Sequence, residues 1–431
     1  MKLKIAGVEA SSLAARFGTP VYVYDQGSLE NRMREFADAF RSPEFDCHVA
    51  YASKAFCCIA MMELVQREGL WADVVSGGEL YTAVKAGFNM KHILLHGNSK
   101  TDAELELALE SGVGTIVVDN LSEAGRLAFL AQHYPQAGTR VLLRINPGVE
   151  AHTHAYIVTA DIDSKFGISI TRPDEICETC RILHESPALT FAGFHAHIGS
   201  QIFEPEAFAA EIDKVCSFAK QFQDQTGIQV SCLDLGGGFA ARYTDKDDCP
   251  PIPVICRQIL EAAARAKKQY GLQVKELIIE PGRSIAAEAG YTLYTVGGIK
   301  DTDHRRYVFV NGGMNDNIRP ALYQAEYDAD LADHLKEPKD EVVTIAGKCC
   351  ESGDIIASDI RLQHAEPGDI LAVYTTGAYG QSMASNYNRL AVPGTLFVKD
   401  GLAHWVIRPQ TPDDLIRNDL SLNHTEAGEA E

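Results

Sequence analysis

The chain has 431 residues, of which 46% are hydrophobic and 23% charged, a composition typical of a globular protein with about two domains. Lys and Arg number 39 against 59 Asp and Glu, and the net charge of −20 argues against nucleic acid or an anionic membrane as a partner. No apolar run is long enough to span a bilayer, and the N-terminus lacks an apolar signal segment. The 11 scattered cysteines favour a reducing compartment, so we expect a cytoplasmic protein.

Short apolar runs alternate with helical patterns between about residues 45 and 283. Each run has the length of a buried strand and ends in a small or chemically capable residue. The eight runs are His48–Ser53, Trp71–Ser76, His92–Gly97, Gly114–Asp119, Arg140–Pro147, Thr190–Gly199, Val230–Gly237 and Glu276–Gly282. Eight strands separated by helices predict an α/β domain over residues 28–283, a parallel (β/α)8 barrel of the TIM type. A doubly wound sheet is the alternative, although it normally has fewer strands and a phosphate-binding motif after the first.

Two further parts of the chain have a different pattern. An apolar strand at Pro20–Tyr24 precedes a helix that begins near Ser28, and after Gly282 strands follow one another without long helices. Those later strands are Tyr291–Ile299, Arg306–Asn311, Glu341–Gly347, Asp369–Tyr374, Gly394–Lys399 and Ala403–Arg408. Their turn-rich connections predict an all-β second domain, a sandwich or barrel-like sheet formed by residues 1–27 and 284–420. The acidic tail, residues 421–431, is predicted to be disordered.

A lysine lies where the first barrel strand meets its helix. Alternating residues before it have the pattern of a half-buried strand, and Lys54 follows in the stretch Tyr51–Phe56. At such a junction a lysine can point into a cavity, where desolvation would lower its pKa and make the amine a better Schiff-base nucleophile. A solvated lysine that merely follows a strand is the simpler alternative, and the other strand ends bear on the choice.

The other predicted strands also end in residues with chemical function. In a parallel barrel the carboxyl ends of all strands meet on one face, where the active site lies. Those ends carry Lys54, Asp73, Ser76, His96, Asn146, His197, Ser200, Gly236–Gly238, Glu280 and Arg283. The three glycines expose backbone N–H groups that suit a phosphate. Glu280 can keep a pyridine nitrogen protonated, which makes such a ring an electron sink.

Two imidazoles alternate in His195-Ala196-His197 and therefore share one face of the sixth predicted strand. His-x-His at the end of a barrel strand is a common zinc arrangement. Hydrolases of that kind usually carry the pair on the first strand and an aspartate after the eighth, whereas Glu280–Arg283 ends the eighth strand here. We therefore expect no metal, and we expect His197 to pack flat against a cofactor ring.

Three polar stretches of the second domain add candidate ligands. The loop Asn311–Tyr323 carries one arginine, Arg319, which suits a carboxylate because a guanidinium pairs with it through two hydrogen bonds. The stretch Lys348–Asp354 is a polar turn after an apolar strand, and Tyr379 stands between glycines. Each stretch taken alone would be read as an ordinary β-turn.

In their order along the chain these segments resemble the fold-type III pyridoxal-phosphate decarboxylases, and within them the diaminopimelate decarboxylase family. The resemblance extends from about Pro20 to Asp419. It is carried by six motifs, His197–Ser200, Gly236–Gly238, Glu280–Arg283, Met314–Tyr323, Cys350–Asp354 and Gly377–Tyr379. It implies decarboxylation of meso-2,6-diaminopimelate to L-lysine and CO₂, the last step of lysine biosynthesis, by a homodimer with shared active sites.

The resemblance also implies a role for each matching residue. Lys54 would bind pyridoxal 5'-phosphate as a Schiff base, His197 would stack on its ring, and Glu280 would pair with its pyridine nitrogen. Asp73 would lie near the cofactor. The cofactor phosphate would be held by Ser200, Gly237, Gly238, Pro281, Gly282, Arg283 and Tyr379. The amino-acid substrate would be bound by Arg283, Arg319, Tyr323, Glu351 and Tyr379.

Cys350 would be the proton donor and would reach the site from the partner chain. The nearest alternatives are decarboxylases of ornithine, arginine or lysine, whose substrates lack a distal carboxylate and would leave Arg319 without a partner. Enzymes for those substrates tend to carry aspartate after the cysteine, where this chain has Glu351. Alanine racemases share the barrel but not the Cys350 segment. A non-catalytic binding protein is the alternative from a different class, and retention of Lys54, Glu280 and Cys350 together argues against it.

Overall fold

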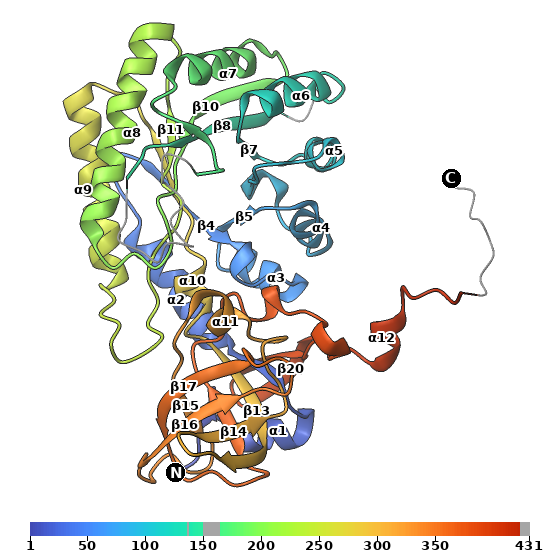
Figure 1. Cartoon of the computed structure of the whole chain (residues 1–431). Coiled ribbons are helices and arrows are strands. Elements are labelled where there is room, and N and C mark those ends of the chain that lie inside the picture. The colour runs from blue at the N-terminus through green and yellow to red at the C-terminus, as the bar shows by residue number, and fades with distance from the viewer. Residues whose placement is uncertain (136–137, 150–163, 423–431) are drawn as a thin grey trace.

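A computed structural model describes residues 1–135, 138–149 and 164–422 of the chain (Figure 1). Its larger part is a closed barrel of parallel strands. The eight strands of the ring are β4 (Asp46–Ala52), β5 (Trp71–Val74), β6 (Ile93–Leu95), β7 (Thr115–Val118), β8 (Thr139–Asn146), β10 (Leu189–His195), β11 (Cys232–Asp234) and β12 (Glu276–Ile279). The ring closes because β12 pairs with β4 and β10 pairs with β8. The predicted barrel is confirmed, and its closure excludes the doubly wound alternative.

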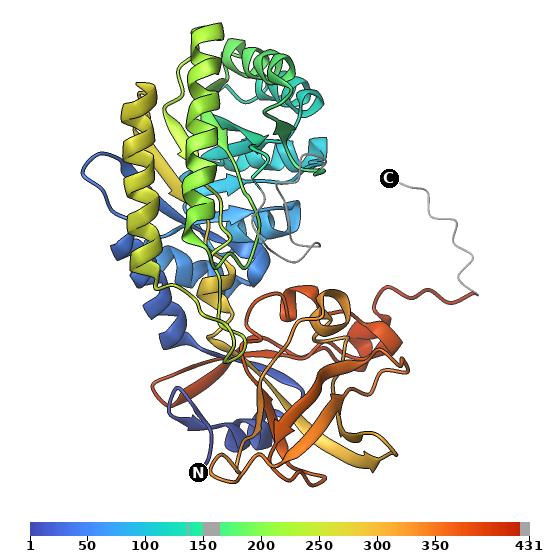
Figure 2. The same cartoon turned by 60° about the vertical axis from the view of Figure 1, so that its left-hand side comes forward.

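Helices surround the barrel and connect its strands. They are α2 (Gln26–Ala39), α3 (Ile59–Arg67), α4 (Gly77–Lys85), α5 (Asp102–Ser111), α6 (Leu121–Ala131), α7 (Pro173–Glu185), α8 (Pro205–Thr226), α9 (Ile252–Tyr270) and the short α10 (Arg283–Ala286). Polar caps define where several begin: Ser76 accepts a hydrogen bond from the Glu79 N–H, and Thr101 forms a capping box with Glu104. In both views α8 and α9 stand side by side on one flank of the barrel (Figure 2).

The inside of the barrel has an apolar layer and, above it, a polar layer. One buried cluster draws a member from each of seven strands, namely Ala50, Leu94, Val117, Leu142, Ala192, Cys232 and Ile278, with Trp71 packed against it. Side chains two residues apart on a strand share a face, so the next inward-facing position on each strand lies two residues further along the chain. Those positions toward the carboxyl ends include Asp73, His96, Arg144, Asp234 and Glu280. The polar layer is therefore built by strand alternation.

A bulge in β10 decides which of its side chains joins the polar layer. The register shifts just before Gly193, after which His195 lies opposite Arg144 of β8. Gly193 has a φ of +155°, and a Cβ at this position would lie 2.0 Å from the carbonyl oxygen of Cys232. Only glycine fits this approach of the two backbones, so the bulge and the inward direction of His195 depend on it.

The second sheet lies against the carboxyl-end face of the barrel (Figure 1). Its strands are β3 (Val21–Asp25), β13 (Gly290–Asp301), β14 (Arg306–Val310), β15 (Ala329–Leu331), β16 (Glu341–Ala346), β17 (Ile355–Leu362), β18 (Ile370–Val373), β19 (Thr395–Lys399) and β20 (Leu402–Ile407). The strand β3 pairs with both β13 and β19, as predicted for a strand that precedes the barrel. The sequence analysis missed β15, which is very short, and β17, whose Ser358 and Asp359 are exposed in mid-strand.

The remaining elements are short. A hairpin of β1 (Lys4–Ile5) and β2 (Val8–Glu9) leads into α1 (Ala10–Phe17), while α11 (Arg319–Tyr323) and α12 (Pro412–Ile416) belong to the C-terminal half. All 11 cysteines are free thiols. Across the described ranges, no helix has both the length and the apolar composition required to cross a membrane. The predicted disordered tail falls, from residue 423 onward, outside the described residues.

Candidate active site

A cavity of about 790 Å³ lies at the carboxyl ends of the barrel strands, and residues of α10 and α11 contribute to its wall. Both parts of the chain contribute to its lining. The candidate residues that line it are Lys54, His96, His197, Ser200, Gly237, Gly238, Glu280, Gly282, Arg283, Arg319, Tyr323 and Tyr379. Residues up to 325 positions apart in sequence are thus brought into one cavity, while the role of each stays a prediction.

Four of the residues to which the family resemblance gives a role lie outside this lining. Asp73 is buried beneath it, and the carbonyl oxygen of Pro281 accepts a hydrogen bond from the backbone N–H of Ala52 at 3.2 Å. Cys350 and Glu351 are exposed on the second sheet's side, and the N–H of Cys350 donates to the Asn388 side chain at 2.6 Å. The predicted proton donor is therefore outside the cavity of its own chain.

Lys54 enters the cavity from a single 3-10 turn, Ser53–Ala55, directly after β4. Its Nζ lies 3.9 Å from Oδ2 of Asp73, and its side chain keeps 40% exposure. Burial lowers the pKa of Lys54, but Asp73, Tyr379 and Glu280 raise it more, so the net change is upward. The expected lowering of this pKa is therefore wrong, because the charges of Asp73, Tyr379 and Glu280 together outweigh burial.

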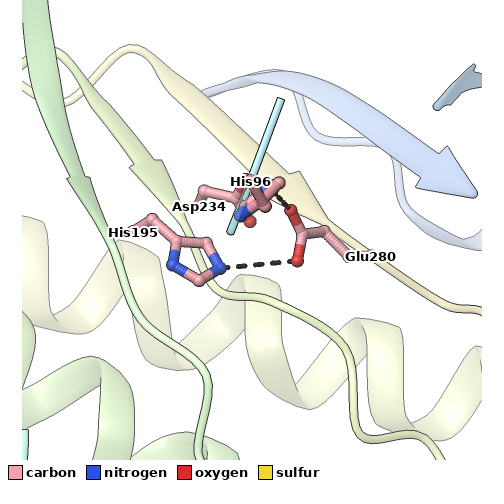
Figure 3. Close-up of side chains that lie close together, drawn as sticks. All are labelled: His96, His195, Asp234 and Glu280. Carbon is pink, nitrogen blue, oxygen red and sulfur yellow. Dashed lines mark ion pairs between the residues drawn. The ribbon is translucent and has the colours of Figure 1, made fainter. Parts of the chain in front are cut away.

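Glu280 lies between two imidazoles in the polar layer (Figure 3). Its Oε1 is 2.6 Å from Nε2 of His96, and its Oε2 is 3.4 Å from Nε2 of His195. The same Nε2 of His96 lies 3.7 Å from Oδ1 of Asp73. Asp234, from the neighbouring strand, accepts a hydrogen bond from the Gly236 N–H at 3.0 Å. All of these side chains are buried.

Burial and charge act in opposite directions on this cluster. Burial would raise the pKa of Glu280, but His96 and His195 lower it well below its ordinary value. Burial lowers the pKa of His195 to about 3, which makes it a neutral imidazole at neutral pH. Burial raises the pKa of Asp73 to about 6 and raises the pKa of Asp234 well above its ordinary value. Glu280 is therefore the most acidic of the three buried carboxyl groups.

The cluster also has the donor set of a metal site. Ligand atoms of His96, His195, Asp234 and Glu280 all lie within 4.8 Å of one another. The sequence analysis considered zinc for His195 and His197, whereas the geometry joins His195 to His96 instead. Since the two imidazoles already lie against opposite oxygens of Glu280, the cluster is accounted for as a carboxylate paired with two imidazoles.

The glycine run after β11 packs against neighbouring strand ends. The N–H of Gly237 donates to Nδ1 of His197 at 3.2 Å, and burial lowers the pKa of that imidazole well below its usual value. A Cβ on Gly237 would lie 2.3 Å from the carbonyl oxygen of Glu280. Gly238 has a φ of +103°, which side chains disfavour. The absence of side chains at these glycines thus keeps the space beside His197 open.

Two buried arginines face the cavity among tyrosines. Arg283 donates from Nε and Nη2 to Oγ of Ser200 at 3.2 and 3.0 Å, and from Nη1 to the Tyr243 hydroxyl at 2.7 Å. Arg319 donates to the Tyr327 hydroxyl at 2.5 Å, and its guanidinium lies 4.7 Å from the centre of the Tyr243 ring. Burial raises the pKa of Tyr243, but the two arginines lower it more. Tyr243 thus contacts both guanidinium groups.

The sequence analysis missed Arg144, Tyr243 and Tyr327. Arg144 lies two positions beyond Leu142 on β8, so the same alternation that marked the polar layer could have found it. Its guanidinium lies 4.5 Å from the Phe166 ring centre, and burial lowers its pKa. Both tyrosines lie in irregular segments without a strand or helix pattern, and Tyr243 is 40 positions from its partner Arg283, so no local pattern marks them.

Residues 26–287 match the family described as pyridoxal-dependent decarboxylase, pyridoxal binding domain. The diaminopimelate decarboxylase of Bacillus subtilis is 47% identical over 419 residues, which cover 97% of this chain and 95% of that protein. The chain belongs to the diaminopimelate decarboxylase family. The structure of the M. jannaschii member in complex with L-lysine is 33% identical, with a TM-score of 0.91 over 97% of this chain and 96% of that one. The Helicobacter pylori member, also with L-lysine, has 31% identity and a TM-score of 0.85, over 94% and 98%.

The cavity fits the cofactor of this pyridoxal-dependent family. It lies in the size range of small-molecule sites and offers an amine on Lys54 to an aldehyde. Glu280 supplies an ionised carboxylate at its buried end. A Cβ on Gly237 would close the space that the glycine leaves open beside His197. These features match, in order, the aldehyde, the pyridine nitrogen and the ring of pyridoxal phosphate.

Proposed function

We propose that this chain catalyses the pyridoxal-phosphate-dependent decarboxylation of meso-2,6-diaminopimelate to L-lysine and CO₂. Relatives named diaminopimelate decarboxylase support the reaction, and two similar structures hold L-lysine. The observation that carries the choice of substrate is the pair Arg283 and Arg319. Both are buried, and neither has a carboxylate ion-pair partner among the residues described.

Two buried positive charges without counterions are costly unless an anion enters the site. The distal carboxylate of diaminopimelate is such an anion, and it is the group that lysine, ornithine and arginine lack. Arg319 suits it because a guanidinium can donate two parallel hydrogen bonds to a carboxylate. Tyr243 and Tyr327 hold that guanidinium at the cavity wall. Tyr323 and Tyr379, which also line the cavity, complete the proposed substrate contacts.

The residues around Lys54 then have distinct tasks. Its amine binds the cofactor covalently, and the bound cofactor supplies an electron sink for the pair left behind when CO₂ departs. Glu280 would hold a proton on the pyridine nitrogen, and His197 would lie against the ring. The phosphate would lie against the backbone of Gly237 and Gly238 and would be bound by the Gly238 N–H with Ser200, Arg283 and Tyr379, since the Gly237 N–H donates to Nδ1 of His197.

We infer that a second copy of the chain completes the site. Cys350 is exposed, and none of the described residues that line the cavity is a cysteine. Cys350 of the second copy would protonate the carbon that has lost CO₂, with Glu351 beside it on the distal ammonium group. The same proposal assigns residues 28–283 to a cofactor-binding domain and residues 1–27 with 284–420 to the domain that completes the partner's site.

Replacing Arg319 by Lys tests the substrate assignment. A lysine keeps the charge but loses the paired hydrogen bonds, so kcat/KM for meso-diaminopimelate should fall at least ~10-fold. The visible absorbance of the bound cofactor should not change, because other residues bind the cofactor. Arg305→Lys, at an exposed arginine of the second sheet, is the matched control and should retain wild-type kinetics. Unchanged kcat/KM in R319K would contradict the assignment.

A further inference from the structure

The carboxylate of Glu280 is paired with imidazoles. Its ion-pair partners in the described part of the chain are His96 and His195, and no lysine or arginine is paired with it. The two contacts engage opposite oxygens of the carboxylate, at 2.6 and 3.4 Å. The imidazole rings lie 4.7 Å apart at 69° and approach from different directions (Figure 3).

Without these contacts a carboxyl group at this depth would take up a proton. Glu280 is 4% exposed, and burial acts to raise its pKa, whereas the two imidazoles lower it. A protonated Glu280 could not stabilise a proton on the neighbouring pyridine nitrogen, because it would carry no negative charge. The role proposed for Glu280 therefore requires donors on the far side of its carboxylate.

We propose that His96 and His195 are positioning residues, which hold Glu280 ionised and aimed at the pyridine nitrogen of the cofactor by donating one hydrogen bond to each of its oxygens. This inference rests on the proposed function, which supplies the cofactor. It adds two residues that act on the reaction through Glu280. In this proposal each imidazole presents an N–H at Nε2, the ring atom that faces Glu280.

Three separate strands of the barrel carry the two imidazoles and the carboxylate. His96 follows β6, His195 ends β10, and Glu280 follows β12, so the three side chains converge only because the barrel is closed. The bulge at Gly193 turns His195 inward. Among the described residues, neither imidazole has another carboxylate as near as Glu280.

His195 is the better position to test because, in the part of the chain that the structure describes, its ion-pair contact is with Glu280 alone, whereas His96 also approaches Asp73. His195→Gln keeps an N–H donor near the place of Nε2, and His195→Leu fills a similar volume without a donor. In H195L we expect kcat for meso-diaminopimelate to fall about 10- to 100-fold, the effect of one hydrogen bond to a charged group, with KM nearly unchanged. H195Q should recover most of this loss.

Cofactor binding gives a readout that does not depend on the substrate. Apoenzyme titrated with pyridoxal phosphate, followed by absorbance, should show a Kd at least ~10-fold weaker in H195L than in H195Q. In a Glu280→Gln background H195L should add little further loss, because His195 acts through Glu280. Circular dichroism and the melting temperature verify folding, and if H195L is unfolded, the same pair of substitutions at His96 replaces it.

Three results would overturn the inference. H195L and H195Q with equal losses would mean that the donor does not matter, and additive losses in the double variant would mean that His195 acts independently of Glu280. Stoichiometric zinc or iron in the purified holoenzyme, with activity lost to a chelator, would make the cluster a metal site instead. Failure of wild-type apoenzyme to bind pyridoxal phosphate would contradict the proposed function itself, and is distinguishable because it does not involve His195.

Discussion

At Lys54 the charge of one amine depends on one buried carboxylate. Asp73 lies 3.9 Å from Nζ and raises the pKa of Lys54, while the carboxyl group of Asp73 itself has a pKa of about 6. Only the neutral amine attacks an aldehyde, so Asp73→Asn should lower the Lys54 pKa and speed cofactor uptake by apoenzyme. The faster cofactor uptake of the Asp73→Asn variant should be present above pH 6. It should vanish below pH 6, because Asp73 of the wild type is then protonated and as uncharged as the asparagine.

Stopped-flow absorbance of apoenzyme mixed with pyridoxal phosphate measures this uptake as a function of pH. Asp38→Asn, at an exposed carboxylate of α2, is the control and should follow the wild-type profile. A slower uptake in D73N at pH 8 would show that Asp73 contributes by orienting the amine and not by its charge.

Tyr243 links the two arginines of the proposed substrate site. Its hydroxyl accepts from Arg283 at 2.7 Å, while its ring lies against Arg319. Tyr243→Phe removes the acceptor and keeps the ring, and a hydrogen bond to a charged group is worth about 1.5–3 kcal/mol. We expect a KM for meso-diaminopimelate raised about 10-fold or more, with a smaller change in kcat. Steady-state kinetics measure both constants, and an unchanged KM would remove Tyr243 from the site.

For single residues, the sequence predicted which side chains belong to the site but not which charges lie next to them. Lys54, His197 and Glu280 were found because each lies at the end of a barrel strand, a position visible in the local pattern. The lowered pKa expected for Lys54 was wrong, because Asp73 meets it only through the pairing of β4 with β5. Tyr243 escaped notice because its partners lie 40 and 76 positions away in sequence.

Among the elements, β10 has the most specific sequence requirement, which is a glycine at position 193. A Cβ at Gly193 would lie 2.0 Å from a neighbouring carbonyl oxygen, so Gly193→Ala must displace β10 from β11. We expect a loss of about 1–3 kcal/mol or more in the free energy of unfolding, with kcat reduced because His195 moves away from Glu280. Gly125→Ala in α6 meets open space and should stabilise by about 0.5–1 kcal/mol.

Urea unfolding of both variants measures this contrast. Equal stability of G193A and G125A would show that β10 relaxes freely, and the account of the bulge would then be wrong. The bulge itself was beyond the sequence analysis, because Gly193 is one glycine inside an otherwise apolar run and its clash is with a residue of another strand.

The order of elements was more predictable than their details. All eight barrel strands were found because apolar runs and helical patterns alternate regularly between residues 45 and 283. The strand β3 was expected to join the second sheet and does so. The strand β17 was missed because it lies at one end of the sheet order and exposes polar side chains, which weakens the apolar signal of a strand.

For the whole molecule the proposal is a dimer in which each chain lends Cys350 to the other. Chains carrying Lys54→Ala and chains carrying Cys350→Ala should each be inactive. When the two are unfolded together and refolded, hybrid dimers should regain one intact site, so that about a quarter of wild-type activity returns if pairing is random. Native mass spectrometry counts the hybrids, and absence of activity despite hybrids would place the donor in the same chain.

The central claim is that the site selects a substrate with a distal carboxylate. The most direct measurement is CO₂ release by the wild-type holoenzyme with meso-diaminopimelate, ornithine, arginine and lysine at equal concentrations. The account predicts CO₂ and L-lysine in equal amounts from meso-diaminopimelate, with the other three decarboxylated at least ~100-fold more slowly in kcat/KM, as expected when a buried charge pair is left unmade. Comparable rates for ornithine or lysine would contradict it, because Arg319 would then have no part in selecting the substrate.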